Sequence, residues 1–126
     1  MDKKTIHVLL VEDDVFLSSI YQKKFEMEGF KVTPVDNGEK VLAEAKKKKP
    51  HIILLDVLLP KRDGFSVLAQ LKADAEVKDV PVILLTNLGQ KDDVEKGLEA
   101  GAVDYLIKAH FKPSEIVDKV KKILHV

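Results

Sequence analysis

His51-Ile52-Ile53-Leu54-Leu55-Asp56 is the stretch that decides the fold of this 126-residue chain. Four consecutive apolar residues that end in a carboxylate are typical of a short strand buried on both faces. A second run of this kind, Thr5-Ile6-His7-Val8-Leu9-Leu10-Val11, ends directly before Glu12, Asp13 and Asp14. Two buried strands that both lead into acidic side chains indicate a cation site at one edge of a sheet.

Strand-like and helix-like segments alternate along the whole chain. We expect strands at residues 5–11, 31–35, 51–55, 81–85 and 103–107. We expect amphipathic helices at residues 15–28, 38–48, 64–73, 91–100 and 113–124. This alternation predicts an α/β fold, a doubly wound five-stranded parallel sheet with helices on both faces. The fourth helix has the thinnest apolar stripe, with Val94 and Leu98 facing inward, so we expect it to be the most loosely packed.

Composition narrows the classes of protein to consider. The length favours a single domain, residues 1–126. The 21 basic and 21 acidic residues balance, so the sequence lacks the basic excess expected of direct nucleic-acid binding. It contains no cysteine, which excludes disulfides and thiolate metal sites. No apolar run reaches membrane-spanning length, and we expect a cytoplasmic protein that does not bind membranes. Of the histidines, His7 is expected to be partly buried and His51 to lie at the surface.

The residues that follow the predicted strands form one chemical constellation. Glu12 and Asp13 follow the first strand, Asp56 the third, Thr86 the fourth and Lys108 the fifth. In a doubly wound sheet these strand ends share one edge. Packed carboxylates repel each other unless a cation neutralises them, and donors that are all oxygen favour Mg²⁺. One carboxylate could then attack phosphorus while Lys108 and Thr86 bind the phosphoryl oxygens.

Four segments, in this order and at this spacing, resemble the receiver domain of bacterial two-component response regulators. They are Leu9-Leu10-Val11-Glu12-Asp13-Asp14, Leu55-Asp56-Val57-Leu58-Leu59-Pro60-Lys61-Arg62-Asp63-Gly64, Pro81-Val82-Ile83-Leu84-Leu85-Thr86 and Gly101-Ala102-Val103-Asp104-Tyr105-Leu106-Ile107-Lys108. The resemblance covers essentially the whole chain. It implies a flavodoxin-like strand order, 2-1-3-4-5, in one receiver domain.

The resemblance also implies roles for the residues of the constellation. Asp56 would accept a phosphoryl group from the phosphohistidine of a sensor histidine kinase or a phosphotransfer protein. Glu12, Asp13, Asp56 and the main-chain carbonyl of Leu58 would hold the Mg²⁺ cofactor. Lys108 would contact the phosphoryl group. The chain would then be no conventional enzyme, because it catalyses only its own phosphorylation and dephosphorylation.

The resemblance further implies a conformational switch. Thr86 would move toward the phosphoryl group and Tyr105 would rotate inward, changing an output surface formed by the fourth helix, fifth strand and fifth helix. A downstream protein or output domain would read that surface, and a homodimer could form there on phosphorylation. A stand-alone receiver and the receiver part of a longer regulator fit the sequence equally well. Ala109 follows Lys108 where the family usually has proline, so we expect a trans peptide bond there.

Three other functions compete with this reading. A phosphatase of the haloacid-dehalogenase type needs a second acid two residues after its nucleophile, and Leu58 occupies that position. A flavodoxin-like flavin site needs a Ser/Thr-rich phosphate loop where this chain has acidic residues. The remaining alternative is a receiver-like protein-binding scaffold that is never phosphorylated. Asp14 is expected to cap the first helix rather than to bind the metal.

Overall fold

A computed structural model of the chain describes residues 5–59, 63–87 and 91–126. Within these ranges, five parallel strands form one sheet in the order β2-β1-β3-β4-β5. Their bounds are β1 His7–Val11, β2 Lys31–Val35, β3 Ile52–Asp56, β4 Val82–Thr86 and β5 Asp104–Ile107. The predicted strand order and parallel pairing are confirmed.

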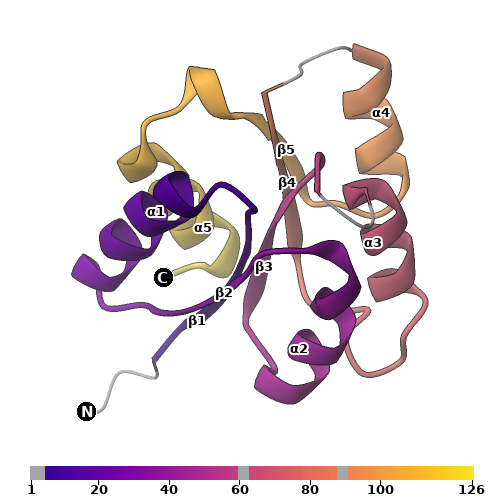
Figure 1. Cartoon of the computed structure of the whole chain (residues 1–126), viewed down its shortest axis with the longest axis horizontal. Coiled ribbons are helices and arrows are strands. Elements are labelled where there is room, and N and C mark those ends of the chain that lie inside the picture. The colour runs from indigo at the N-terminus through magenta and orange to yellow at the C-terminus, as the bar shows by residue number, and fades with distance from the viewer. Residues whose placement is uncertain (1–4, 60–62, 88–90) are drawn as a thin grey trace.

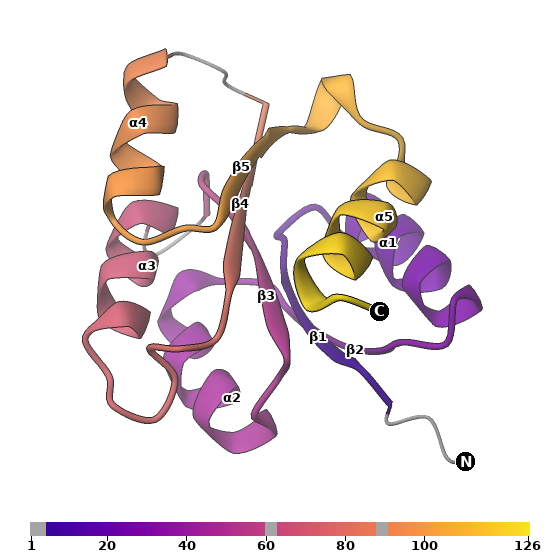
Figure 2. The same cartoon turned by 180° about the vertical axis from the view of Figure 1, so that it is seen from behind.

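Helices cover both faces of the sheet (Figures 1 and 2). Their bounds are α1 Val15–Met27, α2 Val41–Lys48, α3 Gly64–Lys72, α4 Lys91–Glu99 and α5 Pro113–Leu124. Helices α1 and α5 lie on one face, and α2, α3 and α4 lie on the other. None of the helices in the described ranges has the length and apolar character needed to cross a lipid bilayer.

The apolar runs are strands because both of their faces are covered. In β1, Leu9 and Val11 pack into the core beneath α2 and α3, whereas Val8 and Leu10 pack into the core beneath α1 and α5. All four side chains are fully buried. Successive side chains of a strand point to opposite faces, so two cores require a continuous apolar run rather than an alternating one.

The element bounds differ from the predicted ones mainly at the ends. β1 begins at His7 rather than Thr5, and β3 and β4 extend to Asp56 and Thr86. The predicted helix at 38–48 is divided into a 3₁₀ turn, Gly38–Lys40, and α2. The Asn37 side chain accepts a hydrogen bond from the Glu39 N–H at 3.0 Å. This hydrogen bond caps the 3₁₀ turn, which precedes α2.

Helix α4 contacts the sheet differently from the prediction. Val94 is only partly buried, and the expectation that Leu98 faces inward is wrong, because 46% of it is exposed. Gly97 is buried instead. The helix therefore approaches the sheet through a residue without a side chain.

Candidate functional site

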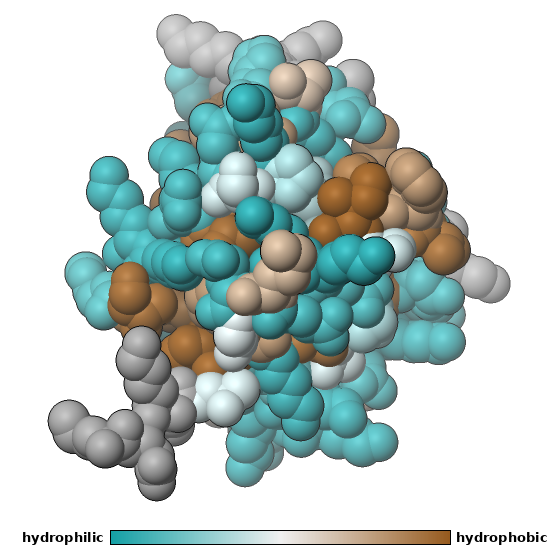
Figure 3. Space-filling model, turned by 90° about the vertical axis from the view of Figure 1, so that its left-hand side faces the viewer, coloured by the Kyte–Doolittle hydropathy of each residue, from teal (hydrophilic) through white to brown (hydrophobic). Residues whose placement is uncertain are grey.

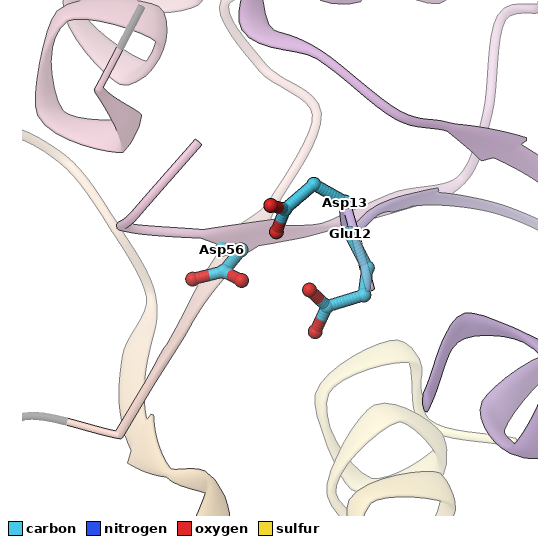
Figure 4. Close-up of side chains that lie close together, drawn as sticks. All are labelled: Glu12, Asp13 and Asp56. Carbon is cyan, nitrogen blue, oxygen red and sulfur yellow. The ribbon is translucent and has the colours of Figure 1, made fainter. Parts of the chain in front are cut away.

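Three carboxylates meet at the carboxyl edge of the sheet. Glu12 and Asp13 follow β1 directly, and Asp56 is the last residue of β3. Each supplies a carboxylate oxygen, and these oxygens all lie within 4.8 Å of one another. Figure 4 shows the Glu12 and Asp13 carboxylates reaching toward Asp56 from the neighbouring strand. The predicted convergence of these acids is confirmed, although Asp56 is more than forty residues from Glu12 and Asp13 in the sequence.

Strand pairing and a helix cap fix the acidic loop after β1. Val11 pairs with Leu55, which places the residues that follow them side by side. The Asp14 carboxylate accepts a hydrogen bond from the Leu17 backbone at 3.1 Å and so caps α1. The Asp14 N–H donates to Glu12 Oε2 at 3.2 Å. Asp14 therefore has the predicted capping role and lies outside the three-carboxylate cluster.

Gly64 supports the main chain of Asp56 from behind. It is the first residue of α3, and a Cβ built on it would lie 2.5 Å from the Asp56 carbonyl oxygen and 2.6 Å from Val57 Cα. Its N–H donates to the Val57 carbonyl at 2.7 Å. The sequence placed Asp63 and Gly64 at a turn and helix start, which is confirmed, but it did not reveal this close contact with Asp56. Its position directly after Asp63, which caps α3, was the available signal.

Lys108 joins the two acidic strands. Its Nζ donates to Asp56 Oδ2 at 2.8 Å and also binds Glu12 Oε1. The three side chains are almost entirely shielded from solvent, with at most 7% of each exposed. Burial alone would lower the pKa of Lys108, but its hydrogen bonds to Asp56 and Glu12 raise it overall. Lys108 therefore carries a positive charge at neutral pH.

One lysine does not balance the charge of the cluster. Burial raises the pKa of Glu12, the Asp56 carboxyl raises it further, and Lys108 offsets this only in part. A raised carboxyl pKa means that the negative charge is unfavourable where it lies. Three carboxylates against one ammonium leave an excess of negative charge, and oxygen donors suit a hard divalent cation. The residues present therefore fit a Mg²⁺ site.

Asp56 is held by its own turn as well as by Lys108. The Leu58 N–H donates to Asp56 Oδ1 at 3.0 Å, so both carboxylate oxygens have a hydrogen-bond donor. The predicted turn continues through residues 60–62, which lie outside the described residues. The Lys108–Ala109 peptide is trans, as expected, and Lys108 opens a short 3₁₀ turn, Lys108–His110.

Thr86 and Tyr105 form a pair next to the cluster. Thr86 ends β4 and is fully buried, and it pairs with Ile107, the residue before Lys108. Burial raises the pKa of Tyr105, and a hydrogen bond with the Thr86 side chain partly offsets this. Only 8% of Tyr105 is exposed. The tyrosine thus already lies inward in this structure, although the resemblance implied that it would turn inward on activation.

This fold and site define a class of signalling domain in which a strand-end aspartate lies within an acidic, lysine-bridged pocket. Residues 8–121 match the family model of the response regulator receiver domain. The chain belongs to this family, whose members are phosphorylatable receivers of two-component systems rather than conventional enzymes.

Individual relatives agree with this assignment. The chain is 38% identical over 117 residues to the DNA-binding dual master transcriptional regulator RpaA of Synechocystis sp., covering 93% of this chain and 48% of RpaA. The crystal structure of a response regulator from Chloroflexus aurantiacus has a TM-score of 0.89 at 33% identity, covering 98% of this chain and 100% of that one. The chain spans about half the length of the curated relatives it matches.

One solved relative holds a metal. The receiver domain of the sensor histidine kinase PA1611 from Pseudomonas aeruginosa has magnesium coordinated in its active-site cleft. It has a TM-score of 0.85 and 31% identity, covering 94% of this chain and 97% of that one.

Proposed function

We propose that this chain is a phosphorylation-dependent switch in which Asp56 accepts a phosphoryl group from a phosphohistidine. The observation that supports this most directly is the convergence of Glu12, Asp13 and Asp56 within 4.8 Å, with Lys108 bound to Asp56. A metal site alone would not need a lysine inside it. A lysine and a cation on either side of one carboxylate are what a dianionic phosphoryl group requires.

The phosphoryl transfer makes Asp56 the nucleophile. One carboxylate oxygen forms a bond to phosphorus as the phosphorus–nitrogen bond of the phosphohistidine breaks. The leaving imidazole keeps the electron pair of that bond and takes up a proton from solvent, which leaves an acyl phosphate on Asp56. The Leu58 N–H and Lys108 fix the orientation of the carboxylate before the donor arrives, which reduces the entropic cost of attack.

Glu12, Asp13, Asp56 and the main-chain carbonyl of Leu58 are the groups proposed to hold Mg²⁺. When bound, Mg²⁺ supplies positive charge that offsets the charge of the phosphoryl oxygens as they approach the acidic pocket. Asp13 is exposed, whereas Glu12 is buried and bound to Lys108. Asp13 is therefore the carboxylate best placed for direct coordination, and Glu12 contributes charge from behind.

Lys108 and Thr86 are proposed to bind the transferred group. Lys108 Nζ already donates to the Asp56 carboxylate. A phosphoryl group on Asp56 would compete with Glu12 for the Lys108 ammonium. Thr86 supplies a buried hydroxyl from the adjacent strand. If Thr86 turns toward the phosphoryl oxygens, it changes its hydrogen bond with Tyr105, and the output surface of α4, β5 and α5 changes with it.

The donor protein must cover the rim of this pocket to bring its phosphohistidine to Asp56. The first turn of α1 follows Asp14 directly and exposes Val15 and Phe16, with 79% and 77% of each accessible. From the side of α1 and α5, the surface shows apolar patches between hydrophilic residues (Figure 3). Membership of the receiver family implies a histidine kinase partner. We propose that the kinase, or a phosphotransfer protein, contacts this first turn.

The remaining partners form part of the same proposal. A downstream protein or output domain reads the surface of α4, β5 and α5, directly or through a homodimer formed on phosphorylation. The protein would work in the cytoplasm, where the kinase domain of a two-component pair lies. Nucleic acid is not a direct ligand of this chain, whose 21 basic and 21 acidic residues balance.

Phosphorylation can be tested with a small donor. We expect the purified chain, incubated with acetyl phosphate and Mg²⁺, to gain the mass of one phosphoryl group, and Asp56→Ala to gain none. A matched control is Asp63→Asn, because Asp63 is an aspartate that only caps a helix and asparagine caps equally well. Phosphorylation of Asp56→Ala, or failure of the parent to react, would contradict the proposal. Failure of the parent would favour the unphosphorylated scaffold.

A further inference from the structure

Helix α4 contacts the sheet at Gly97. A Cβ built on Gly97 would lie 2.6 Å from Leu84 Cδ1, 3.0 Å from Tyr105 Cδ2 and 3.5 Å from Phe65 Cε1. Real Cβ atoms essentially never come within 3.0 Å of another heavy atom. Residues that carry a side chain therefore cannot occupy this position unless the helix or its neighbours move.

The backbone itself does not call for glycine at this position. Gly97 lies inside α4, and among the described residues the glycines with a positive φ are Gly29 and Gly101. In a helix interior, glycine is less favourable than alanine because it loses more conformational freedom on folding. The close contact with β4 and β5 is the feature that accounts for glycine here.

The ring beside Gly97 belongs to the switch pair. The Tyr105 hydroxyl is hydrogen-bonded to Thr86, while the Cδ2 edge of the same ring faces Gly97. Tyr105 thus spans the distance between α4 and a residue at the end of β4. Thr86 is two residues from Leu84, whose Cδ1 is the atom nearest to a Cβ built on Gly97. One small region therefore links α4 to the strand that borders Asp56.

A cation–π contact holds α4 at the same level. Lys96 Nζ lies 4.5 Å from the centroid of the Phe65 ring on α3, and Phe65 is also the third neighbour of Gly97. The helix is thus fixed from the side by α3 and from below by Leu84 and Tyr105. Its outer face has exposed Leu98 and polar side chains.

We propose that Gly97 is a positioning residue of the switch, which lets Tyr105 lie inward on Thr86 while α4 rests directly on the ring. This inference rests on the proposed function, because it assigns Gly97 to the path from Asp56 to the output surface. With a side chain at position 97, the Leu84 methyl group and the Tyr105 ring must shift, or α4 must move outward. Each of these shifts alters the contact between α4 and the ring, through which a change at Asp56 reaches the output surface.

The chain offers a direct probe of Tyr105. It has two tyrosines and no tryptophan. In a Tyr21→Phe background, Tyr105 is therefore the sole tyrosine and the sole source of the tyrosine fluorescence. In that background we compare Gly97→Ala with Glu95→Ala, an exposed position on the same helix. The measurement is acrylamide quenching in the unphosphorylated, metal-free protein. We expect quenching of Tyr105 to increase severalfold in Gly97→Ala and to stay at the parent value in Glu95→Ala.

A second variant covers the case in which Gly97→Ala does not fold. Gly97→Ala combined with Leu84→Ala removes the atom closest to the new Cβ, and circular dichroism reports whether each variant is folded. We expect quenching in the double variant to return toward the parent value. Parent-like quenching in a folded Gly97→Ala variant would overturn the proposal. So would a double variant that is folded and as strongly quenched as a denatured chain.

The switch itself is tested with beryllofluoride and Mg²⁺, which mimic the phosphorylated state. We expect the Tyr105 fluorescence to change in the parent and not in Gly97→Ala. If Gly97 only stabilises the fold, Gly97→Ala should lower the urea midpoint and leave this fluorescence response intact. That result would overturn the switch role. If neither protein responds to beryllofluoride while their acrylamide quenching differs, the proposed function fails. The packing of Tyr105 against Gly97 would still be supported.

Discussion

At the amino ends of β1 and β3 the sheet buries a histidine that is hydrogen-bonded to neutral groups, whereas at their carboxyl ends it gathers three carboxylates beside one lysine. His7 Nε2 lies 2.6 Å from the Thr33 hydroxyl, and the His7 ring also bonds to the Lys48 carbonyl. The His7 N–H donates to His51 Nδ1 at 3.0 Å. Polar groups at this end are thus satisfied by the fold itself.

At the carboxyl ends of the strands, the hydrogen bonds are satisfied but the charges are not balanced. Every buried side-chain nitrogen and oxygen in the described part of the chain has a hydrogen-bond partner, so the difference lies in charge rather than in hydrogen bonds. The pKa of Glu12 is raised and that of His7 is lowered, each first by burial. A buried histidine can become neutral near pH 7, but clustered carboxylates need a cation. The first arrangement serves stability, and the second keeps capacity for a ligand.

The largest effect is expected at the amino end. Replacing His7 with alanine removes a buried ring and leaves Thr33 and the Lys48 carbonyl without this partner, which should cost about 3 kcal/mol of unfolding free energy. Urea denaturation measures it. His110→Ala is the control, because His110 is exposed. Equal losses in the two variants would show that His7 has no special structural role.

Mg²⁺ should stabilise the protein through the carboxyl end. At a free concentration about 100 times the dissociation constant, a ligand that binds only the folded state adds about 2.7 kcal/mol. We expect the melting temperature of the parent to rise with Mg²⁺ and that of Asp13→Asn to rise far less. Asp14→Asn is the matched neighbour, since asparagine can still cap α1. An identical response in both variants would place the ion elsewhere.

The pH dependence of stability should come from the amino end. Burial, followed by Lys31, Lys48 and His51, lowers the pKa of His7 from 6.5. The unfolded chain therefore binds a proton more readily, and stability should be lost as the pH falls below 6.5 toward the folded-state pKa. The loss is at most about 1.4 kcal/mol per pH unit for one proton.

His7→Gln tests this assignment because glutamine does not titrate. Urea midpoints measured across the range from neutral to mildly acidic pH should fall less steeply for His7→Gln than for the parent. His51→Gln serves as the companion variant, because His51 Nδ1 accepts the His7 N–H and His51 is one of the neighbours that lower the pKa of His7. An unchanged slope in His7→Gln would move the titration to another group.

The smallest effect is expected for Asp56→Asn without metal. The change removes one charge from the cluster and leaves the Glu12–Lys108 pair. Because the acids repel one another, we expect a gain of about 1 kcal/mol, opposite in sign to the loss at His7. Denaturation in the presence of a chelator measures it, with Asp63→Asn as an exposed control. A loss of stability would mean that the Asp56–Lys108 contact outweighs the repulsion.

The fold and the site residues could be predicted because they depend on order along the chain. Buried parallel strands read as apolar runs, and their carboxyl ends must share an edge. Glu12, Asp13, Asp56 and Lys108 are therefore predicted to lie together from the sequence alone, and the structure brings them together. The capping role of Asp14 followed from local backbone chemistry in the same way.

The contacts that escaped prediction depend on packing between distant segments. Gly64 and Gly97 matter because of the atoms that press against them, and a glycine in the sequence does not reveal which atoms those are. Leu98 was assigned inward from helical spacing, but the position of α4 is set by Gly97 one residue earlier. His51 was expected at the surface, yet its ring accepts a hydrogen bond from β1. Periodicity identifies a helix face only approximately when a glycine allows close approach.

Lys108 gives the chain an internal counterion. Because its ammonium joins Glu12 of one strand end to Asp56 of another, the pocket holds together without a divalent ion. Chelators should therefore leave the protein folded, unlike domains whose architecture depends on a structural metal. Metal binding then changes the contacts of Glu12 and Asp56 within a protein that is already folded. The domain can therefore respond to its signal without refolding.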